Sequence, residues 1–302
     1  MDLRAKLLDP AQPVLLYGTT PPREGTPPEQ VDSAADKLAA RLAGLPLDGV
    51  VVYDIQDETG RTQAPRPFPF IRTIDPRDYA HFFRLPTIVY KALGTMDEPQ
   101  WRKWLAESEK SVQFLSVVGR PASGVRYPLP LSRAIRIASD NPAFIVGGVV
   151  IAERHDAQRS EAARLLAKGI EGCGYFISQA VYHAAPTRRL LADYLRDCRG
   201  AGAQPKRIVL TFAPCGREKT LTFMRWLGVN ISPDTERAIL GAANPLAKSI
   251  EICRDNLRRI LDGGYAGQVP LGVNVESVSI NRDEIDASVE LLHTLRETMA
   301  GR

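Results

Sequence analysis

Charged side chains that directly follow apolar runs are the first residues of interest in this 302-residue chain. The segment DIQDET, residues 54–59, follows one such run, and a carboxyl group of Asp57 or Glu58 could act there as a general acid. Such a segment is more often a solvated loop. Arg120 follows another run, where a guanidinium can hold a phosphate or a carboxylate with two hydrogen bonds. An ion pair between Arg120 and Asp57 is the alternative.

Polar residues also follow the other apolar runs. If these runs are parallel strands of a barrel, their carboxyl ends meet at one edge, where sites are built. The segment LLYGTTPP at residues 15–22 stands out because the first residue past its apolar run is Gly18, which has no side chain. The other candidates are Thr19, Thr20, Asp54, Gln56, Lys91, Glu153, His155, Gln179, Tyr182, His183, Glu218, Glu276, Asn281 and Arg282.

Short runs rich in β-branched residues alternate with amphipathic segments along the chain. The runs are almost continuously apolar, which is typical of parallel strands covered by helices. Eight of them predict a (β/α)8 TIM barrel in a single domain over residues 1–302. The predicted strands are Val14–Tyr17, Gly49–Asp54, Thr87–Lys91, Val112–Val118, Phe144–Ile151, Tyr175–Gln179, Arg207–Phe212 and Gly272–Glu276. The predicted helices are Pro28–Ala43, Pro76–Arg84, Glu98–Ser108, Leu131–Ser139, Ala157–Gly169, Ala185–Arg199, Lys219–Trp226, Leu246–Leu261 and Arg282–Met299.

The competing architecture is a doubly wound open sheet. That fold favours a GxGxxG motif after the first strand, and the sequence has none there. Two further segments connect the predicted elements. The Pro-rich stretch at residues 63–70 is predicted to be an ordered loop above the barrel, and residues 230–245 a connection with a short helix.

Composition and charge narrow the functional class. The chain is 44% hydrophobic and 25% charged, and its net charge of +4 comes from scattered Lys and Arg, so we expect no nucleic-acid partner. Cys173, Cys198, Cys215 and Cys253 form no CxxC pair, so neither a metal site nor a disulfide framework is predicted. No apolar stretch approaches ~18 residues, the length of a membrane span. The N-terminal segment also lacks the apolar core of a signal peptide, so we expect a cytoplasmic protein.

Several motifs, taken in order, resemble the methylenetetrahydrofolate reductase family. CGYFISQAVYH at residues 173–183 is similar to the family's strand that ends in a Thr-Gln-aromatic run. AERH at residues 152–155 resembles its Pro-Glu-x-His turn, and SINRDE at 279–284 resembles its closing Leu-Asn-Arg-x-Glu. The resemblance covers residues 14–297. It implies a (β/α)8 barrel that reduces a folate by hydride transfer.

Four residues are assigned to the folate, two of them by the resemblance. Gln179 and Arg282 fall on positions that contact folate in the family. An amide such as that of Gln179 offers a donor and an acceptor in one plane, which suits the edge of a pterin. Thr20 and Tyr182, which follow strands next to these positions, are assigned to the same substrate.

Three other residues are assigned by the resemblance to a nucleotide cofactor. Glu161 and Lys168 match an acid and a lysine that contact the family's flavin nucleotide. His155 matches the histidine of the Pro-Glu-x-His turn, although a histidine at a helix start can also belong to a capping arrangement. Lys168 lies late in a predicted helix, where a cation favours the helix dipole in any case.

The sequence departs from the family pattern around the flavin ring. Gly18 stands where the family has a glutamate, and Arg120 stands near the family's aspartate. Thr87 and Pro130 stand near a histidine and a tyrosine. We therefore expect the FAD site to be altered and NAD(P)H to be the hydride donor, with Arg120 contributing to the cofactor site.

The missing strand-1 acid leaves the proton donor open. Asp57 or Glu58 is the predicted general acid, with Glu153 next in line. The main hypothesis is an NAD(P)H-dependent oxidoreductase of one-carbon folate metabolism that reduces 5,10-methylenetetrahydrofolate or a related pterin adduct. The alternative is a non-redox barrel that binds folate or transfers a one-carbon unit. The sequence does not predict the oligomeric state.

Overall fold

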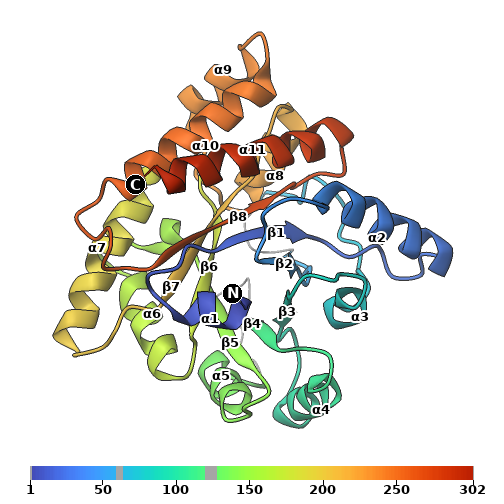
Figure 1. Cartoon of the computed structure of the whole chain (residues 1–302), viewed down its shortest axis with the longest axis vertical. Coiled ribbons are helices and arrows are strands. Elements are labelled where there is room, and N and C mark those ends of the chain that lie inside the picture. Colours follow the sequence, from blue (N-terminus) through green and yellow to red (C-terminus); the bar gives the residue numbers. More distant parts are fainter. Residues whose placement is uncertain (1, 59–63, 120–127, 302) are drawn as a thin grey trace.

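The computed structural model describes residues 2–58, 64–119 and 128–301. Within them, eight parallel strands pair in chain order and β8 closes on β1, which makes a barrel (Figure 1). The predicted (β/α)8 barrel is therefore confirmed. The strands are β1 (Leu15–Thr19), β2 (Gly49–Val52), β3 (Thr87–Ala92), β4 (Phe114–Val118), β5 (Ile145–Val150), β6 (Tyr175–Ala180), β7 (Arg207–Phe212) and β8 (Leu271–Glu276).

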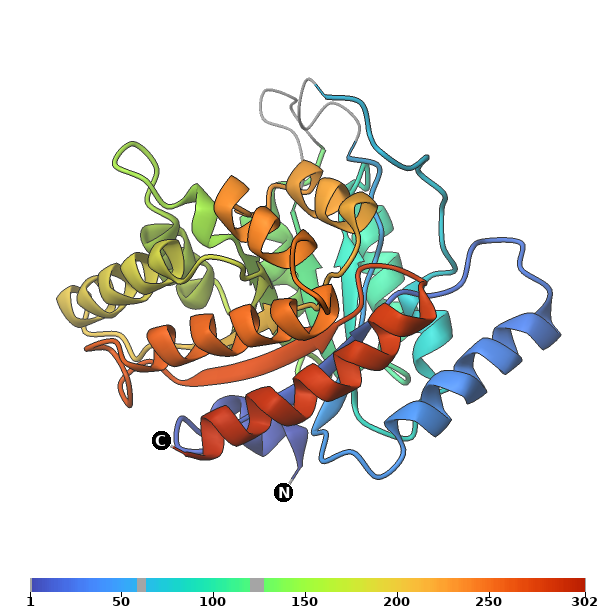
Figure 2. The ribbon, with the colours of Figure 1, turned by 90° about the horizontal axis from the view of Figure 1, so that it is seen from above.

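Helices cover the outside of the barrel (Figure 1). Both chain ends lie at the same end of the molecule (Figure 2). The helices are α1 (Leu3–Leu8), α2 (Pro28–Leu42), α3 (Pro76–Ala80), α4 (Glu98–Ser108), α5 (Leu131–Ser139), α6 (Glu161–Ile170), α7 (Ala184–Gly200), α8 (Glu218–Trp226), α9 (Pro233–Leu240), α10 (Pro245–Leu261) and α11 (Arg282–Ala300), with a 3₁₀ turn, η1 (Ala152–Arg154).

The short helix α1 closes the amino-terminal end of the barrel. Its Leu3 and Leu7 are buried and pack against barrel side chains that include Leu16 and Ile88. The buried Arg207 of β7 donates hydrogen bonds from Nε to the Leu7 carbonyl oxygen at 3.4 Å and from Nη1 to the Leu271 carbonyl oxygen at 2.6 Å. The sequence did not predict α1, because six residues are too short for a periodic pattern.

Other differences from the predicted elements are local. Helix α6 begins at Glu161 and not at Ala157, because the Ser160 hydroxyl accepts a hydrogen bond from the Ala163 N–H at 3.0 Å and caps the helix there. The predicted short helix within residues 230–245 is α9. Of the stretch 63–70, residue 63 lies outside the described residues, and residues 64–70 form neither helix nor strand.

Candidate functional site

A cavity of about 600 Å³ opens at the carboxyl ends of the strands. This is the end at which (β/α)8 barrels place their sites. Strand ends and the loops that follow them form most of its wall, and residues of helices α5, α6 and α8 form the rest. The opposite end of the barrel is closed by α1.

Gly18 lies in register with Glu276 on the neighbouring strand β8. A Cβ atom at position 18 would lie 2.7 Å from the ring of Tyr53, which follows β2. The Tyr53 ring therefore occupies the space that a side chain on residue 18 would take. Both Tyr53 and Glu276 line the cavity, so a carboxyl group lies beside residue 18, where the family resemblance implies an acid.

Burial raises the pKa of the Glu276 carboxyl group from its ordinary 4.5 to about 7. The Tyr53 hydroxyl hydrogen-bonds to this carboxyl group and partly opposes the rise in pKa. The same hydroxyl accepts a hydrogen bond at 2.7 Å from Nδ2 of Asn274, which is fully buried in β8. With a pKa of about 7, the Glu276 carboxyl group can both take up and release a proton near neutral pH.

Gln179, at the end of β6, lines the cavity, and only one of the two polar atoms of its amide group has a hydrogen-bond partner among the described residues. Its Nε2 donates a 2.5 Å hydrogen bond to the carbonyl oxygen of Leu227, at the end of α8. Its Oε1 is buried and has no hydrogen-bond partner in the described part of the chain. Buried polar atoms are nearly always paired, so an acceptor left open in a cavity wall suits an N–H group of a ligand.

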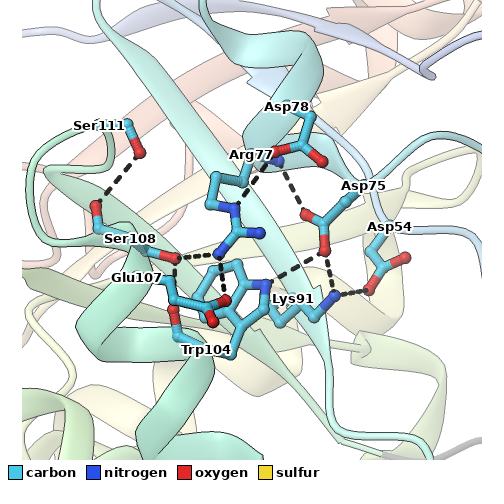
Figure 3. Close-up of polar contacts among 9 residues, drawn as sticks. All are labelled: Asp54, Asp75, Arg77, Asp78, Lys91, Trp104, Glu107, Ser108 and Ser111. Atoms are coloured by element: carbon cyan, nitrogen blue, oxygen red, sulfur yellow. Dashed lines mark hydrogen bonds and ion pairs between the residues drawn. The ribbon is translucent and has the colours of Figure 1, made fainter.

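Asp54, which follows Tyr53 in the cavity wall, belongs to a network behind β3 (Figure 3). Its Oδ2 accepts a 2.8 Å hydrogen bond from the Ala92 N–H and lies 4.0 Å from Lys91 Nζ. Lys91 Nζ also lies 2.6 Å from Asp75, whose other contacts include the Trp104 Nε1–H at 3.1 Å. Burial raises the pKa of Asp54, and Lys91 opposes this.

The two residues of α6 that were assigned to a nucleotide line the cavity, but both also hold α6 to β5. Lys168 Nζ donates a 2.8 Å hydrogen bond to the Val149 carbonyl oxygen, and burial lowers the pKa of this amine. The buried Glu161 accepts a hydrogen bond from the Ile151 N–H at 3.4 Å and pairs with Arg164.

Of the AERH turn, the structure places Arg154 in the described cavity wall but not the predicted residues Glu153 and His155. His155 Nε2 lies 2.8 Å from Asp193 of α7, while its Nδ1 is buried without a partner among the described residues. Glu153 is half-buried in η1. Among the described residues that line the cavity, only Arg154 comes from this turn.

Two residues assigned to the folate also lie away from the described cavity wall. Tyr182 is buried, and its hydroxyl donates a 2.6 Å hydrogen bond to the Ala213 carbonyl oxygen, which explains its position without a ligand. Arg282 is the first residue of α11, its side chain is 86% exposed, and it lies 3.5 Å from Asp286.

The remaining predicted residues lie at the rim of the cavity or outside the described residues. Thr20 and Glu58 line the cavity. Asp57 is exposed and is not part of the described wall. Arg120 lies outside the described residues. Sequence reasoning placed Glu276 at a strand end but gave it no role, because its pairing with Gly18 exists only once the barrel closes.

Comparison with solved structures finds similarity over nearly the full length of the chain. A protein from Clostridium thermocellum that binds two copies of 5-methyl-5,6,7,8-tetrahydrofolic acid is 32% identical, with a TM-score of 0.83 over 98% of this chain and 99% of that one. The present chain belongs to the same family as this protein. No protein-family model and no curated protein matches the sequence.

More distant matches include dihydropteroate synthases. The Xanthomonas albilineans enzyme in complex with 7,8-dihydropteroate is 14% identical with a TM-score of 0.47, over 99% of this chain and 98% of that one. This likeness is too weak to carry a functional argument. The comparisons do not bear on the resemblance to methylenetetrahydrofolate reductase, which stays a prediction. None of the helices in the described residues is long and apolar enough to cross a membrane.

Proposed function

We propose that this protein binds a reduced folate carrying a one-carbon unit, with the pterin ring in the cavity at the barrel mouth. The observation that carries the proposal is the relative of 32% identity that binds 5-methyl-5,6,7,8-tetrahydrofolic acid. The alignment covers 98% of this chain and so includes the strand ends that form the cavity.

The chemistry of the cavity wall supports this ligand. A pterin presents N–H donors along one edge, and Gln179 Oε1 and the Glu276 carboxyl group are acceptors in the wall. Tyr90, Phe223 and Met224 add apolar surface against which a ring can pack. The volume of about 600 Å³ also lies within the usual range of small-molecule pockets.

Binding, or transfer of a one-carbon unit without hydride chemistry, is the form of the proposal that the comparisons support best. In this form Glu276 and Gln179 orient the pterin, and the wall of the barrel excludes water from the one-carbon unit. The proposal therefore adopts the non-redox alternative as its first reading.

Reduction of 5,10-methylenetetrahydrofolate by NAD(P)H is the second candidate, and the position of Glu276 favours it. In that reaction a hydride adds to the methylene carbon, the bond from this carbon to N10 breaks, and N10 gains a proton. A carboxyl group with a pKa of about 7 in the cavity wall can supply that proton near neutral pH. Glu276 then replaces Asp57, Glu58 and Glu153 as the proposed acid.

The residues assigned to a flavin nucleotide do not favour tight FAD binding. Lys168 is hydrogen-bonded to the backbone of β5, and Glu161 to the Ile151 N–H directly after it. We therefore assign no step to a flavin.

Titration calorimetry with 5-methyltetrahydrofolate tests the binding proposal. We expect saturable binding by the wild-type protein, and absence of binding overturns the proposal. Incubation with NADH or NADPH and 5,10-methylenetetrahydrofolate then separates the two candidates, with and without added FAD. Loss of the reduced nicotinamide absorbance together with formation of 5-methyltetrahydrofolate supports reduction. Binding of folate without that loss supports the non-redox reading.

A further inference from the structure

Arg66 lies on a group of aromatic rings at the rim of the cavity. Its guanidinium carbon lies 5.4 Å from the ring centre of Phe70, 5.8 Å from that of Phe223 and 5.0 Å from that of Trp226. We call these three rings the aromatic shelf. At such distances the ring faces stabilise the positive charge of a guanidinium.

The aromatic shelf joins the Pro-rich segment to α8. Trp226 Nε1 donates a 3.1 Å hydrogen bond to the Ala64 carbonyl oxygen, and the rings of Phe68 and Phe223 meet edge to face with centroids 5.4 Å apart. These contacts fix the backbone on both sides of Arg66. The arginine is therefore held in place at the cavity before any ligand arrives.

The hydrogen-bonding capacity of Arg66 is not used by the described residues. Its Nε and Nη1 are buried and have no hydrogen-bond partner there. The ring faces balance the charge, but they do not replace the in-plane acceptors that a guanidinium ordinarily binds. Because Arg66 also lines the cavity, a carboxylate entering with a ligand can supply an acceptor to this guanidinium through a charge-assisted hydrogen bond.

Helix α8 links this position to the proposed pterin site. Gln179 hydrogen-bonds to Leu227 at one end of the helix, and Phe223 lies four residues earlier, beneath Arg66. That spacing corresponds to roughly 6 Å along a helix. Phe223, Met224 and Leu227 all line the cavity and give it an apolar wall between the two polar positions.

We propose that Arg66 on its aromatic shelf binds a carboxylate of the glutamyl tail of the folate. This inference rests on the proposed function. The pterin lies at Gln179 and Glu276, the aminobenzoyl ring packs along α8, and the tail carboxylate reaches Arg66. The protein thereby selects folates with a glutamyl tail over simple pterins.

The test measures the binding of two ligands to the wild-type protein and to two variants of Arg66. The ligands are 5-methyltetrahydrofolate and 5,6-dimethyltetrahydropterin, which lacks the aminobenzoyl-glutamate tail. We expect Arg66→Gln to weaken binding of the folate by about 10- to 100-fold, as for loss of a hydrogen-bonded charge, and to change the affinity for the pterin by less than about twofold. Arg66→Lys keeps the charge without the planar fork and should recover part of the folate affinity.

The matched control is Arg72→Gln in the same connection. Arg72 is 76% exposed, lies 3.8 Å from Glu24 and is not part of the described cavity wall. Its replacement should leave both affinities unchanged, and thermal melting of all variants checks that they are folded. If the wild-type protein binds no folate, the proposed function fails. If it binds folate, and both Arg66 variants weaken the two ligands equally or not at all, the assignment of Arg66 is overturned.

Discussion

The Tyr53 ring occupies the space that a side chain on residue 18 would take. We predict that Gly18→Ala lowers the free energy of unfolding by about 1–3 kcal/mol, because the new methyl group meets the Tyr53 ring at 2.7 Å. Urea denaturation measures the change. Gly200→Ala, at the end of α7 where a Cβ meets nothing within 4 Å, is the control and should not destabilise the protein. Equal stability of Gly18→Ala and wild type contradicts the close fit.

Glu276 makes stability depend on pH. Its pKa rises from 4.5 in the unfolded chain to about 7 in the fold, so the folded state retains a proton that the unfolded state releases between these values. The contribution of Glu276 to stability is therefore highest below pH 4.5, falls as the pH rises, and is lowest above pH 7. The shift corresponds to a change on the order of 3 kcal/mol.

Replacement of the Glu276 carboxyl group should remove its contribution to the pH dependence of stability. We predict that Glu276→Gln gains stability relative to wild type between pH 5 and pH 8, because the buried charge no longer forms. Denaturation curves of wild type and Glu276→Gln at pH 5 and pH 8 give the difference in their free energies of unfolding. The contributions of the other titrating groups are the same in both proteins and cancel in this difference. A difference that stays constant with pH means that Glu276 ionises as an exposed carboxyl group does.

Among the elements, β3 is joined to α3 and α4 through Lys91. The side chain is 14% exposed, pairs with Asp75 at the start of α3, and lies 5.2 Å from the Trp104 ring of α4. We predict that Lys91→Met lowers the free energy of unfolding by about 1–3 kcal/mol, because Asp54 and Asp75 lose their shared cation.

A lysine on the surface of α4 provides the control for Lys91. Lys103 is 78% exposed and lies 3.8 Å from Glu107, so Lys103→Met should change stability by no more than about 0.5 kcal/mol. Chemical denaturation of both variants compares them. Similar losses in the two would show that the partly buried network (Figure 3) contributes no more than an ordinary surface pair.

In the molecule as a whole, we expect the closed end of the barrel to contribute to stability and the open end to contribute to folate binding. Arg207 at the closed end binds backbone carbonyl groups, and burial lowers its pKa to about 10. We predict that Arg207→Met costs about 2–4 kcal/mol of stability because those carbonyl groups lose their donor, while the folate affinity of the folded protein stays unchanged.

Gln179 at the open end should respond in the opposite way. We predict that Gln179→Ala weakens folate binding by about 1–3 kcal/mol and lowers stability less than Arg207→Met does, because only the Leu227 carbonyl group loses its donor. Melting curves and calorimetric titrations of both variants test this division. It fails if Arg207→Met alters the affinity as strongly as Gln179→Ala does.

The sequence by itself determined the barrel and the end at which its site lies. Alternation of apolar runs and amphipathic segments is a local pattern, and the eight runs gave strands close to those observed. Gln179 could be placed at the cavity in the same way, because it directly ends an apolar run. The lack of a side chain at residue 18 was also visible in the sequence.

Only the tertiary structure decided what surrounds these positions. Closure of the barrel pairs β1 with β8, which brings Glu276 beside Gly18 from the other end of the chain. Packing of residues 64–70 on α8 likewise places Phe223 and Trp226 around Arg66. Sequence periodicity reports which face of an element is buried but not which distant element covers it, so contacts between remote segments appear only in the folded chain.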